Sequence, residues 1–300
     1  MLMKGDFHMH STCSDGNLSP TELVRYAKKR KVDIISLTDH NDCDGLDEAI
    51  NEGKRSDIVV IPGVELSTKY KENRVHILGY FKDDSYNNEL FREVLKKVKG
   101  DKSGELRSIF GSAINFNGYK KKLYVESGIQ LLKFFGASVV LAHPVLLSEE
   151  CFFNIKNMDF DGIEARYFLN SDDDTEFYIK FAKEKGLYYT AGSDFHTRIE
   201  EYRIHGLIGD VFLNEEEIED FGDDNYILYK LEQELNIQFN TKKQIILKSI
   251  YSYIQNRGNL NSHDNINLLG TSSFNLVWEE VCSNILNNML DDNIKDIDNL

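Results

Sequence analysis

The sequence predicts an α/β fold with a parallel sheet. Over the first two-thirds of the chain, short apolar runs alternate with helical patterns, which is typical of strands joined by helical crossovers. Polar side chains gather where these runs end, as they do around the mouth of a closed parallel barrel. The 300 residues suffice for one large barrel domain or two ordinary domains. The expected strands span residues 6–10, 33–37, 58–64, 74–81, 138–142, 162–165, 187–191 and 206–212.

The first helix is expected over residues 18–30. Ser19 is a favourable N-cap, Pro20 suits the first helical position and Glu22 completes a capping box. A helix at this place would carry the chain back from the first strand to the second, as a βαβ unit requires.

Two segments break the alternation. Residues 82–127 are polar and basic, and we interpret them as an insertion that is helical from Asn88 to Lys99. After residue 212 the sequence changes again. Residues 215–224 form an acidic linker, and residues 241–256 and 273–294 carry apolar side chains at helical spacing. We therefore expect a barrel domain over residues 1–212 and a mainly helical C-terminal extension of unknown role over residues 213–300.

The composition narrows the function classes. The apolar fraction is 41%, and since no apolar run is long enough to span a membrane, we expect neither a transmembrane helix nor a secretory signal. Its four cysteines suggest no disulfide framework, so a reducing cytoplasm is expected. A formal charge of −15 argues against a broad basic nucleic-acid surface, although residues 92–122 hold nine Lys/Arg and three Asp/Glu.

Ligand-type side chains recur at the predicted strand ends. His8 and His10 are two residues apart in a strand, so both imidazoles can face one centre. Imidazole suits zinc and other first-row metals, and carboxylates also suit harder ions such as Mn²⁺. His143 precedes Pro144, which favours an extended backbone at the histidine. A single histidine at a strand end is more often structural, but packing does not explain six of the eight histidines falling at such places beside Asp15, Glu65 and Asp194.

Six short motifs together resemble one family. They are His8-Met-His-Ser-Thr-Cys-Ser-Asp-Gly16, Thr38-Asp-His40, Gly63-Val-Glu65, His76-Ile-Leu-Gly79, Ala142-His-Pro144 and Ser193-Asp-Phe-His196. In content, order and spacing they resemble the PHP (polymerase and histidinol phosphatase) domain family over residues 1–212. The stretches 14–23 and 37–40 most resemble its stand-alone branch of nucleoside 3′,5′-bisphosphate phosphatases and 5′→3′ exoribonucleases.

The resemblance implies a distorted seven-stranded (β/α) barrel that holds two or three divalent metal ions, with Mn, Zn and Fe all open. One ion would be bound by His8, His10, Glu65 and Asp194. A second would be bound by Glu65, His76 and His143, and a third by Asp15, His40 and His196. Phosphate esters of nucleotides or short oligonucleotides would then be hydrolysed by a hydroxide shared between metals.

The reaction also needs catalytic groups besides the metal ligands, and the sequence offers several candidates for them. The leaving alkoxide needs a metal or a general acid, and Asp39, His196 and His205 are all open. Asp39 also suits a role in orienting a metal-bound histidine. Arg166 and Arg198 lie just beyond strand ends and are the preferred phosphate contacts, although a surface ion pair is the more common role of such an arginine. The basic insertion would add a second phosphate contact or simply form a solvated surface.

Two departures from the stand-alone branch leave the substrate open. Residues 82–127 are shorter than the branch's helical insertion and lack its substrate-contacting motif, and the C-terminal extension has no counterpart. A phosphatase for a small metabolite such as histidinol phosphate is one alternative. Another is a PHP module of a larger nucleic-acid-processing or defence assembly, in which the C-terminal helices bind a protein partner or a second copy. Residues 274–281 resemble helices that open nuclease-like domains in restriction-type proteins.

Overall fold

The computed structural model describes residues 3–116, 121–199, 204–215, 217 and 218, which belong to one compact unit spanning Met1–Phe221. The helices expected over residues 241–256 and 273–294 lie outside these residues, as does most of the acidic linker. No helix in the described part is both long and apolar enough to cross a membrane.

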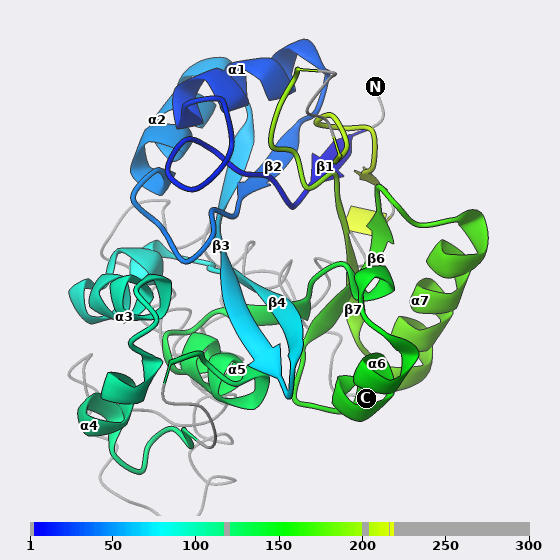
Figure 1. The fold of residues 1–300 in the computed structure, drawn as a ribbon. Helices are drawn as coiled ribbons and strands as arrows, with labels where there is room; N and C mark the ends of the chain where they lie inside the picture. Colours follow the sequence, from blue (N-terminus) through cyan, green and yellow to red (C-terminus); the bar gives the residue numbers. More distant parts are fainter. Residues whose placement is uncertain (1–2, 117–120, 200–203, 216, 219–300) are drawn as a thin grey trace, which may run out of the picture. The chain divides into compact units, whose positions relative to one another are not determined.

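Eight strands form one sheet in the spatial order β7-β6-β5-β4-β3-β2-β1-β8. The two ends of this sheet approach each other, because Phe7 N donates to Ala191 O at 2.9 Å and Met9 pairs with Phe195 as a parallel bridge. The strands therefore nearly close into a barrel, with helices outside them (Figure 1). The strands are β1 Lys4–Asp6, β2 Ile34–Leu37, β3 Val59–Tyr70, β4 Asn73–Tyr80, β5 Ser138–Leu141, β6 Gly162–Tyr167, β7 Tyr188–Gly192 and β8 Leu213–Asn214.

The predicted α/β barrel is confirmed, and so is the capping of its first helix. Ser19 accepts a hydrogen bond from Glu22 N, and the Glu22 carboxylate accepts one from the backbone N–H of Ser19, which closes the predicted capping box. The helices are α1 Pro20–Lys29, α2 Leu46–Ser56, α3 Glu89–Lys99, α4 Leu106–Phe110, α5 Val125–Phe134, α6 Glu149–Ile155 and α7 Asp172–Lys185. Short 3-10 turns lie at Asp84–Asn87, Ser103–Glu105 and Pro144–Leu146.

The expectation of a wholly parallel sheet is wrong at β4. This strand runs antiparallel to both β3 and β5. Only Lys71 and Glu72 separate β3 from β4, and Lys71 has a positive φ of 52°. A connection of two residues can join antiparallel neighbours but is far too short for a parallel crossover.

The last predicted strand, residues 206–212, is also wrong. These residues form turns, and only Leu213–Asn214 pairs with the sheet, antiparallel to β1. Gly209 has a φ of 79°, and its N–H donates to the Asp6 side chain at Oδ2, 2.8 Å away, whereas Asp210 N donates within the turn to Leu207 O.

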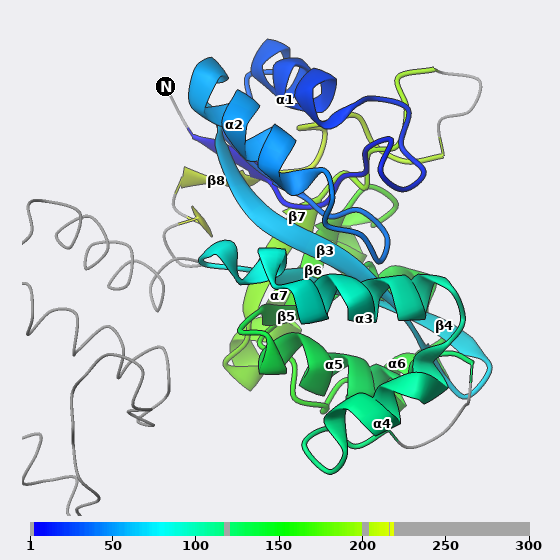
Figure 2. The same cartoon turned by 90° about the vertical axis from the view of Figure 1, so that its left-hand side faces the viewer.

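The insertion contains the expected helix. The side chain of Asn88 caps α3 by accepting from Leu90 N and Phe91 N, and the helix buries Phe91, Val94, Leu95 and Val98. The Phe91 ring packs against the rings of Phe81 and Phe135. Figure 2 shows α3, α4 and α5 on one side of the β3–β4 pair.

The barrel interior is apolar at one level and polar at the next. Its apolar part contains Phe7, Leu78, Tyr80, Val140, Ala142, Ala191 and Leu213. Beyond them, towards the carboxyl ends of the parallel strands, lie side chains that are almost completely buried although they are polar: His8, His10, Glu65, Glu164 and Asp194. Buried polar groups are costly unless they are paired or bind a ligand, so this level is where chemistry is expected.

Gly192 tests how tightly the polar level is packed. A β carbon at this position would overlap Glu164 Oε1 and the Cβ of His8. We expect Gly192→Ala to lower the free energy of unfolding by about 1–3 kcal/mol, because the Glu164 carboxylate is held by His8 and His143 and the Cβ of His8 moves only with its backbone. Urea denaturation followed by circular dichroism measures this change. Gly100→Ala, at the exposed end of α3, is the control and should change stability by less than about 1 kcal/mol. Equal effects of both substitutions would contradict this account.

Candidate metal centre

His8 and His10 are the first residues of the site, and they lie in the segment directly after β1. Both imidazoles are fully buried, and their Nε2 atoms lie 3.2 Å apart. Met9, between them, belongs to the apolar core instead. This alternation is the one predicted for an extended segment, and it places the two histidines on the same side.

Glu65 is the residue that most of the other groups face. Its Oε1 lies 2.9 Å from His76 Nδ1 and 3.0 Å from His143 Nε2. Its Oε2 lies 3.3, 3.2 and 3.0 Å from the nitrogens of His8, His10 and His40, respectively. Glu65 was expected just past a strand end, but β3 continues to Tyr70, so Glu65 lies inside the strand and His76 lies inside β4.

Asp194 faces the same centre from the segment after β7. Its Oδ1 lies 3.3 Å from His8 Nε2 and 3.1 Å from His10 Nε2. Its Oδ2 accepts a hydrogen bond from Tyr167 OH at 2.9 Å and lies 3.0 Å from His205 Nδ1. Asp194 thus directs Oδ1 towards His8 and His10, while its Oδ2 is bound on the other side by Tyr167 and His205.

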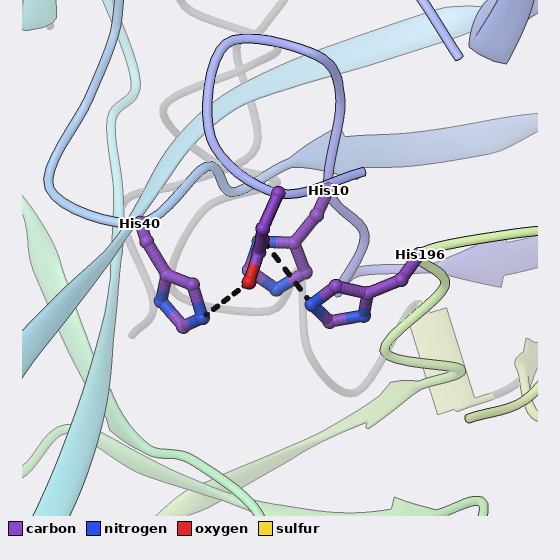
Figure 3. A group of neighbouring side chains, drawn as sticks. His10, His40 and His196 are labelled. Atoms are coloured by element: carbon purple, nitrogen blue, oxygen red, sulfur yellow. Dashed lines mark ion pairs between the residues drawn. The ribbon is translucent and has the colours of Figure 1, made fainter. Parts of the chain in front are cut away.

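A third group surrounds Asp15 on the loop after His10. The carboxylate lies 3.3 Å from His196 Nε2 and 3.7 Å from both His40 Nε2 and His10 Nδ1. Figure 3 shows the imidazoles of His10, His40 and His196 converging, with the ion pairs as dashed lines. The Asp15 side chain is 54% exposed, so this group lies at the mouth of the site.

The arrangement fits metal ions. Four sets of side chains each bring possible ligand atoms within 4.8 Å of one another: His8 with His10, Glu65 and Asp194; His10 with Asp15, His40 and His196; His40 with Glu65 and His76; and Asp194 with His196 and His205. Moreover, Glu65 Oε2 is buried and has no hydrogen-bond partner among the described residues. An unpaired buried carboxylate oxygen is costly, and a cation held between it and the imidazoles would compensate it.

The close approach of buried carboxylates and imidazoles also shifts the pKa values of these groups. Burial raises the pKa of Glu65, but the surrounding histidines, His76 foremost, outweigh burial and hold that pKa well below its usual value. Burial lowers the pKa of His8, yet nearby carboxylates raise it well above its usual value. Burial lowers the pKa of His10 too, and Asp194 and Glu65 raise it to about 9. The buried carboxylates therefore stabilise positive charge near them, and this charge can come from protons on the imidazoles or from bound divalent ions.

Glu164 supports the centre and was missed by the sequence analysis. It is fully buried in β6, where Oε1 lies 2.9 Å from His8 Nδ1 and Oε2 accepts from His143 N at 2.6 Å. A carboxylate on Nδ1 leaves Nε2 free to face a metal. The sequence does contain one indication of its role, since Glu164 is a charged residue within the otherwise apolar predicted strand 162–165.

Asp39 supports a loop. It was expected to orient a histidine, but Oδ1 accepts from Ser11 N and Ser14 Oγ at 2.7 and 2.6 Å, and Oδ2 accepts from Ser11 Oγ at 2.6 Å. These bonds fix the turn that carries Asp15.

The expectation of an extended backbone at His143 is wrong. Its φ is 25° and its ψ is 62°, a strained conformation for a residue before proline. The bonds of its backbone N–H to Glu164 and of its imidazole to Glu65 hold the residue there. Asp194, with a φ of 52°, is another site residue with a positive φ.

The two predicted phosphate-binding arginines lie in different settings. Arg166 is ion-paired with Glu217, whose Oε1 lies 2.6 Å from Nη2, and the same oxygen accepts from Tyr189 OH. Arg198 is exposed and lies two residues after His196, with its guanidinium 5.5 Å from the centre of the Tyr26 ring. Within the described part of the chain, Arg166 forms an ion pair with a carboxylate, whereas Arg198 lies nearer in sequence to a site residue.

Known proteins resemble the chain over most of its described length. The PHP domain model matches residues 6–121, and the LlaJI restriction endonuclease model matches residues 166–299. The 5′-3′ exoribonuclease of Haemophilus influenzae is 28% identical over 65% of this chain and 91% of that protein. The 3′,5′-nucleoside bisphosphate phosphatase of Chromobacterium violaceum is 27% identical over 64% and 86%, respectively. The uncharacterized protein MJ1295 of Methanocaldococcus jannaschii is 31% identical over 65% and 82%.

The fold agrees with these relatives. A proposed metal-dependent phosphoesterase from Bifidobacterium adolescentis superposes with a TM-score of 0.58 at 20% identity, covering 73% of this chain and 95% of that chain. The chain belongs to the PHP domain family, as the motifs predicted, and it is a hydrolase of that family.

Glu164→Gln tests the support behind His8. The amide keeps the size of the side chain but removes its charge. It also places an NH₂ donor beside the nitrogens of His8 and His143, which need an acceptor. We expect Mn²⁺ affinity to fall about 10- to 100-fold, as for other residues that orient metal ligands. Isothermal titration calorimetry of the protein with Mn²⁺ measures it, with exposed Glu126→Gln as the control. Unchanged affinity in the Glu164 variant would show that this carboxylate does not position the centre.

Proposed function

We propose that the chain is a metal-dependent phosphoesterase that hydrolyses phosphate esters of nucleotides or short oligonucleotides. The observation that supports this most directly is the convergence of histidines and carboxylates around Glu65, whose buried Oε2 faces three imidazoles without a hydrogen bond. Such a set binds cations, and phosphate esters are substrates that bound cations recognise and neutralise.

Nine residues would hold the metal ions. We assign His8, His10, Glu65 and Asp194 to one ion, Glu65, His76 and His143 to a second, and Asp15, His40 and His196 to a third. In support, the first set is close together as a whole, and the third is close together with His10 added. His40 also approaches Glu65 and His76, so it is a candidate ligand of the second ion.

The donor set leaves the choice of metal among Mn, Zn and Fe, because it mixes imidazoles with carboxylates. Two or three such ions, when bound, would lower the pKa of water towards neutrality and neutralise negative charge on the phosphoryl oxygens. The protein's own groups would hold these positions. Glu164 would fix the His8 ring and the His143 backbone, and Asp39 would fix the turn at Asp15.

We compare the candidates for the general acid and for the phosphate-binding cation by their contacts and exposure in the structure. Both oxygens of Asp39 already accept hydrogen bonds from Ser11 and Ser14, which favours a supporting role. His196 is partly exposed at the mouth, but it is also assigned to the third ion and its Nδ1 faces the carbonyl oxygen of Asp194, so it would assist the leaving group only indirectly. Arg198 is our candidate for a phosphate contact, whereas Arg166 would first have to leave Glu217.

Relatives support the substrate class. The chain covers most of the length of two proteins named as a 5′-3′ exoribonuclease and a 3′,5′-nucleoside bisphosphate phosphatase. A small-metabolite phosphatase remains the alternative enzyme, since a shorter stretch is 37% identical to a phosphoribosyl 1,2-cyclic phosphate 1,2-diphosphodiesterase of Eggerthella lenta, over 76 residues.

Turnover tests both enzyme hypotheses. With Mn²⁺ present, we expect the full chain to release phosphate or nucleotides from adenosine 3′,5′-bisphosphate or from a 5′-phosphorylated oligonucleotide. Histidinol phosphate and p-nitrophenyl phosphate serve as comparison substrates. No turnover of any of these by a protein that demonstrably binds metal would refute the proposal, and preference for histidinol phosphate would favour the alternative.

His8→Ala and His10→Ala test the ligand assignment. Each variant removes a buried nitrogen that faces both Glu65 and Asp194, so activity should fall at least about 100-fold together with loss of metal at the first group. Metal analysis after gel filtration gives the stoichiometry, and circular dichroism confirms folding. Wild-type activity in either variant would mean that the ligands are assigned wrongly.

A second candidate function concerns the C-terminal extension. The match of residues 166–299 to the LlaJI restriction endonuclease model favours a role in a larger nucleic-acid-processing or defence assembly. In that case residues 213–300 would bind a protein partner or a second copy, while the barrel retains hydrolysis.

Removal of residues 224–300 separates these roles. If the extension serves assembly, the truncated protein should keep its turnover while its apparent size on gel filtration falls by more than the lost mass. Multi-angle light scattering gives the absolute mass of both proteins. A monomeric full-length chain that gains nothing from the extension would exclude self-association, and loss of turnover would place the extension in the enzyme instead.

A further inference from the structure

Lys99 connects the insertion to two loops of the metal centre. It is the last residue of α3, and its ammonium Nζ lies 2.8 Å from Asp42 Oδ2 and 3.3 Å from the carbonyl oxygen of Cys13. Cys13 comes two residues before Asp15, and Asp42 comes two residues after His40. One side chain thus joins the loops that carry two members of the Asp15–His40–His196 group.

The loop that carries Asp15 is held at several points. Ser11 O accepts from both Ser14 N and Gly16 N, and Asp39 binds the hydroxyls of Ser11 and Ser14. Lys99 adds a contact at Cys13, on the side of the loop that faces the insertion. Since the Asp15 side chain is 54% exposed, its position depends on these loop contacts more than on packing.

The neighbouring cations of α3 have different partners. Lys97, two residues earlier, pairs with Glu93 and Glu105 inside the insertion at 3.4 and 2.8 Å. Arg92 pairs with Asp44 at 2.8 Å, on the loop that also contains Asp42. The basic character of the insertion therefore serves, at these positions, to bind acidic groups of the protein itself.

We propose that α3 sets the metal affinity of the Asp15–His40–His196 group, with Lys99 as the positioning residue. This rests on the metal assignment in the proposed function but not on its substrate. The insertion would thereby tune the outermost metal without contacting the reacting phosphate.

The sign of the effect distinguishes positioning from simple electrostatics. A positive ammonium beside a cation site repels the cation, so its removal should strengthen metal binding if charge alone mattered. A positioning role predicts weaker metal binding. Without the Lys99 ammonium the two loops lose a side chain that bonds both of them, and Asp15 and His40 become less well ordered.

Lys99→Met keeps the apolar stem and removes the charge. We expect the weakest Mn²⁺ site of the full-length protein to lose about fivefold in affinity, a modest effect that suits a half-exposed ion pair. Lys99→Arg, which can still reach both partners, should restore most of it, and Lys97→Met should bind Mn²⁺ like the wild type. Titration with Mn²⁺ alone, followed by the electron paramagnetic resonance signal of free Mn²⁺, gives the affinities without any substrate.

Two further variants make the result specific. Asp42→Asn removes the carboxylate partner of Lys99, so Lys99→Met should have no additional effect in that background, and it should likewise have none in an Asp15→Asn background. Unchanged or tighter Mn²⁺ binding by Lys99→Met overturns the inference, whatever the enzyme hydrolyses. Weaker binding by a protein that turns over none of the phosphate esters would leave this inference standing while the proposed function fails. A wild-type protein that binds no Mn²⁺ overturns both.

Discussion

The site depends on one buried carboxylate. Glu65 lies inside β3 with both oxygens among imidazole nitrogens, and 1% of its side chain is exposed. A lone charge at such a depth would be prohibitively costly, so the surrounding strands have to bring compensating groups to it. The antiparallel β3–β4 pair does this directly, because it sets His76 opposite Ser67, two residues along from Glu65. The parallel strands on either side deliver the other histidines from their carboxyl ends.

Support for these ligands comes from the residues behind them. Glu164 binds the far side of the His8 ring and the backbone of His143, while Tyr167 binds the outer oxygen of Asp194. Two of the supported residues, His143 and Asp194, have positive φ angles. Strained backbone of this kind persists where many bonds fix a residue, and here those bonds aim side chains at one centre.

The outer part of the centre is built differently. Asp15 is more than half exposed and stands on a turn whose hydroxyls bind Asp39, while the helix of the insertion contacts the same turn through Lys99. The inner histidines and carboxylates lie on or directly after the strands of the barrel, whereas Asp15 lies on a loop that the inserted helix contacts. The inner group around Glu65 is therefore buried in the barrel, whereas the outer group around Asp15 is partly exposed and held through loop contacts.

The sequence by itself identified most of the strands and the histidines and carboxylates that the structure brings together, because apolar runs and residue types are visible locally. It determined the capping of α1 for the same local reason. Only the tertiary structure decided that β4 runs antiparallel, that Glu65 lies within a strand and that Glu164 stands behind His8. These features arise between residues far apart in the chain, so no local pattern could reveal them. The same holds for Asp39, whose partners Ser11 and Ser14 belong to the separate loop that carries Asp15.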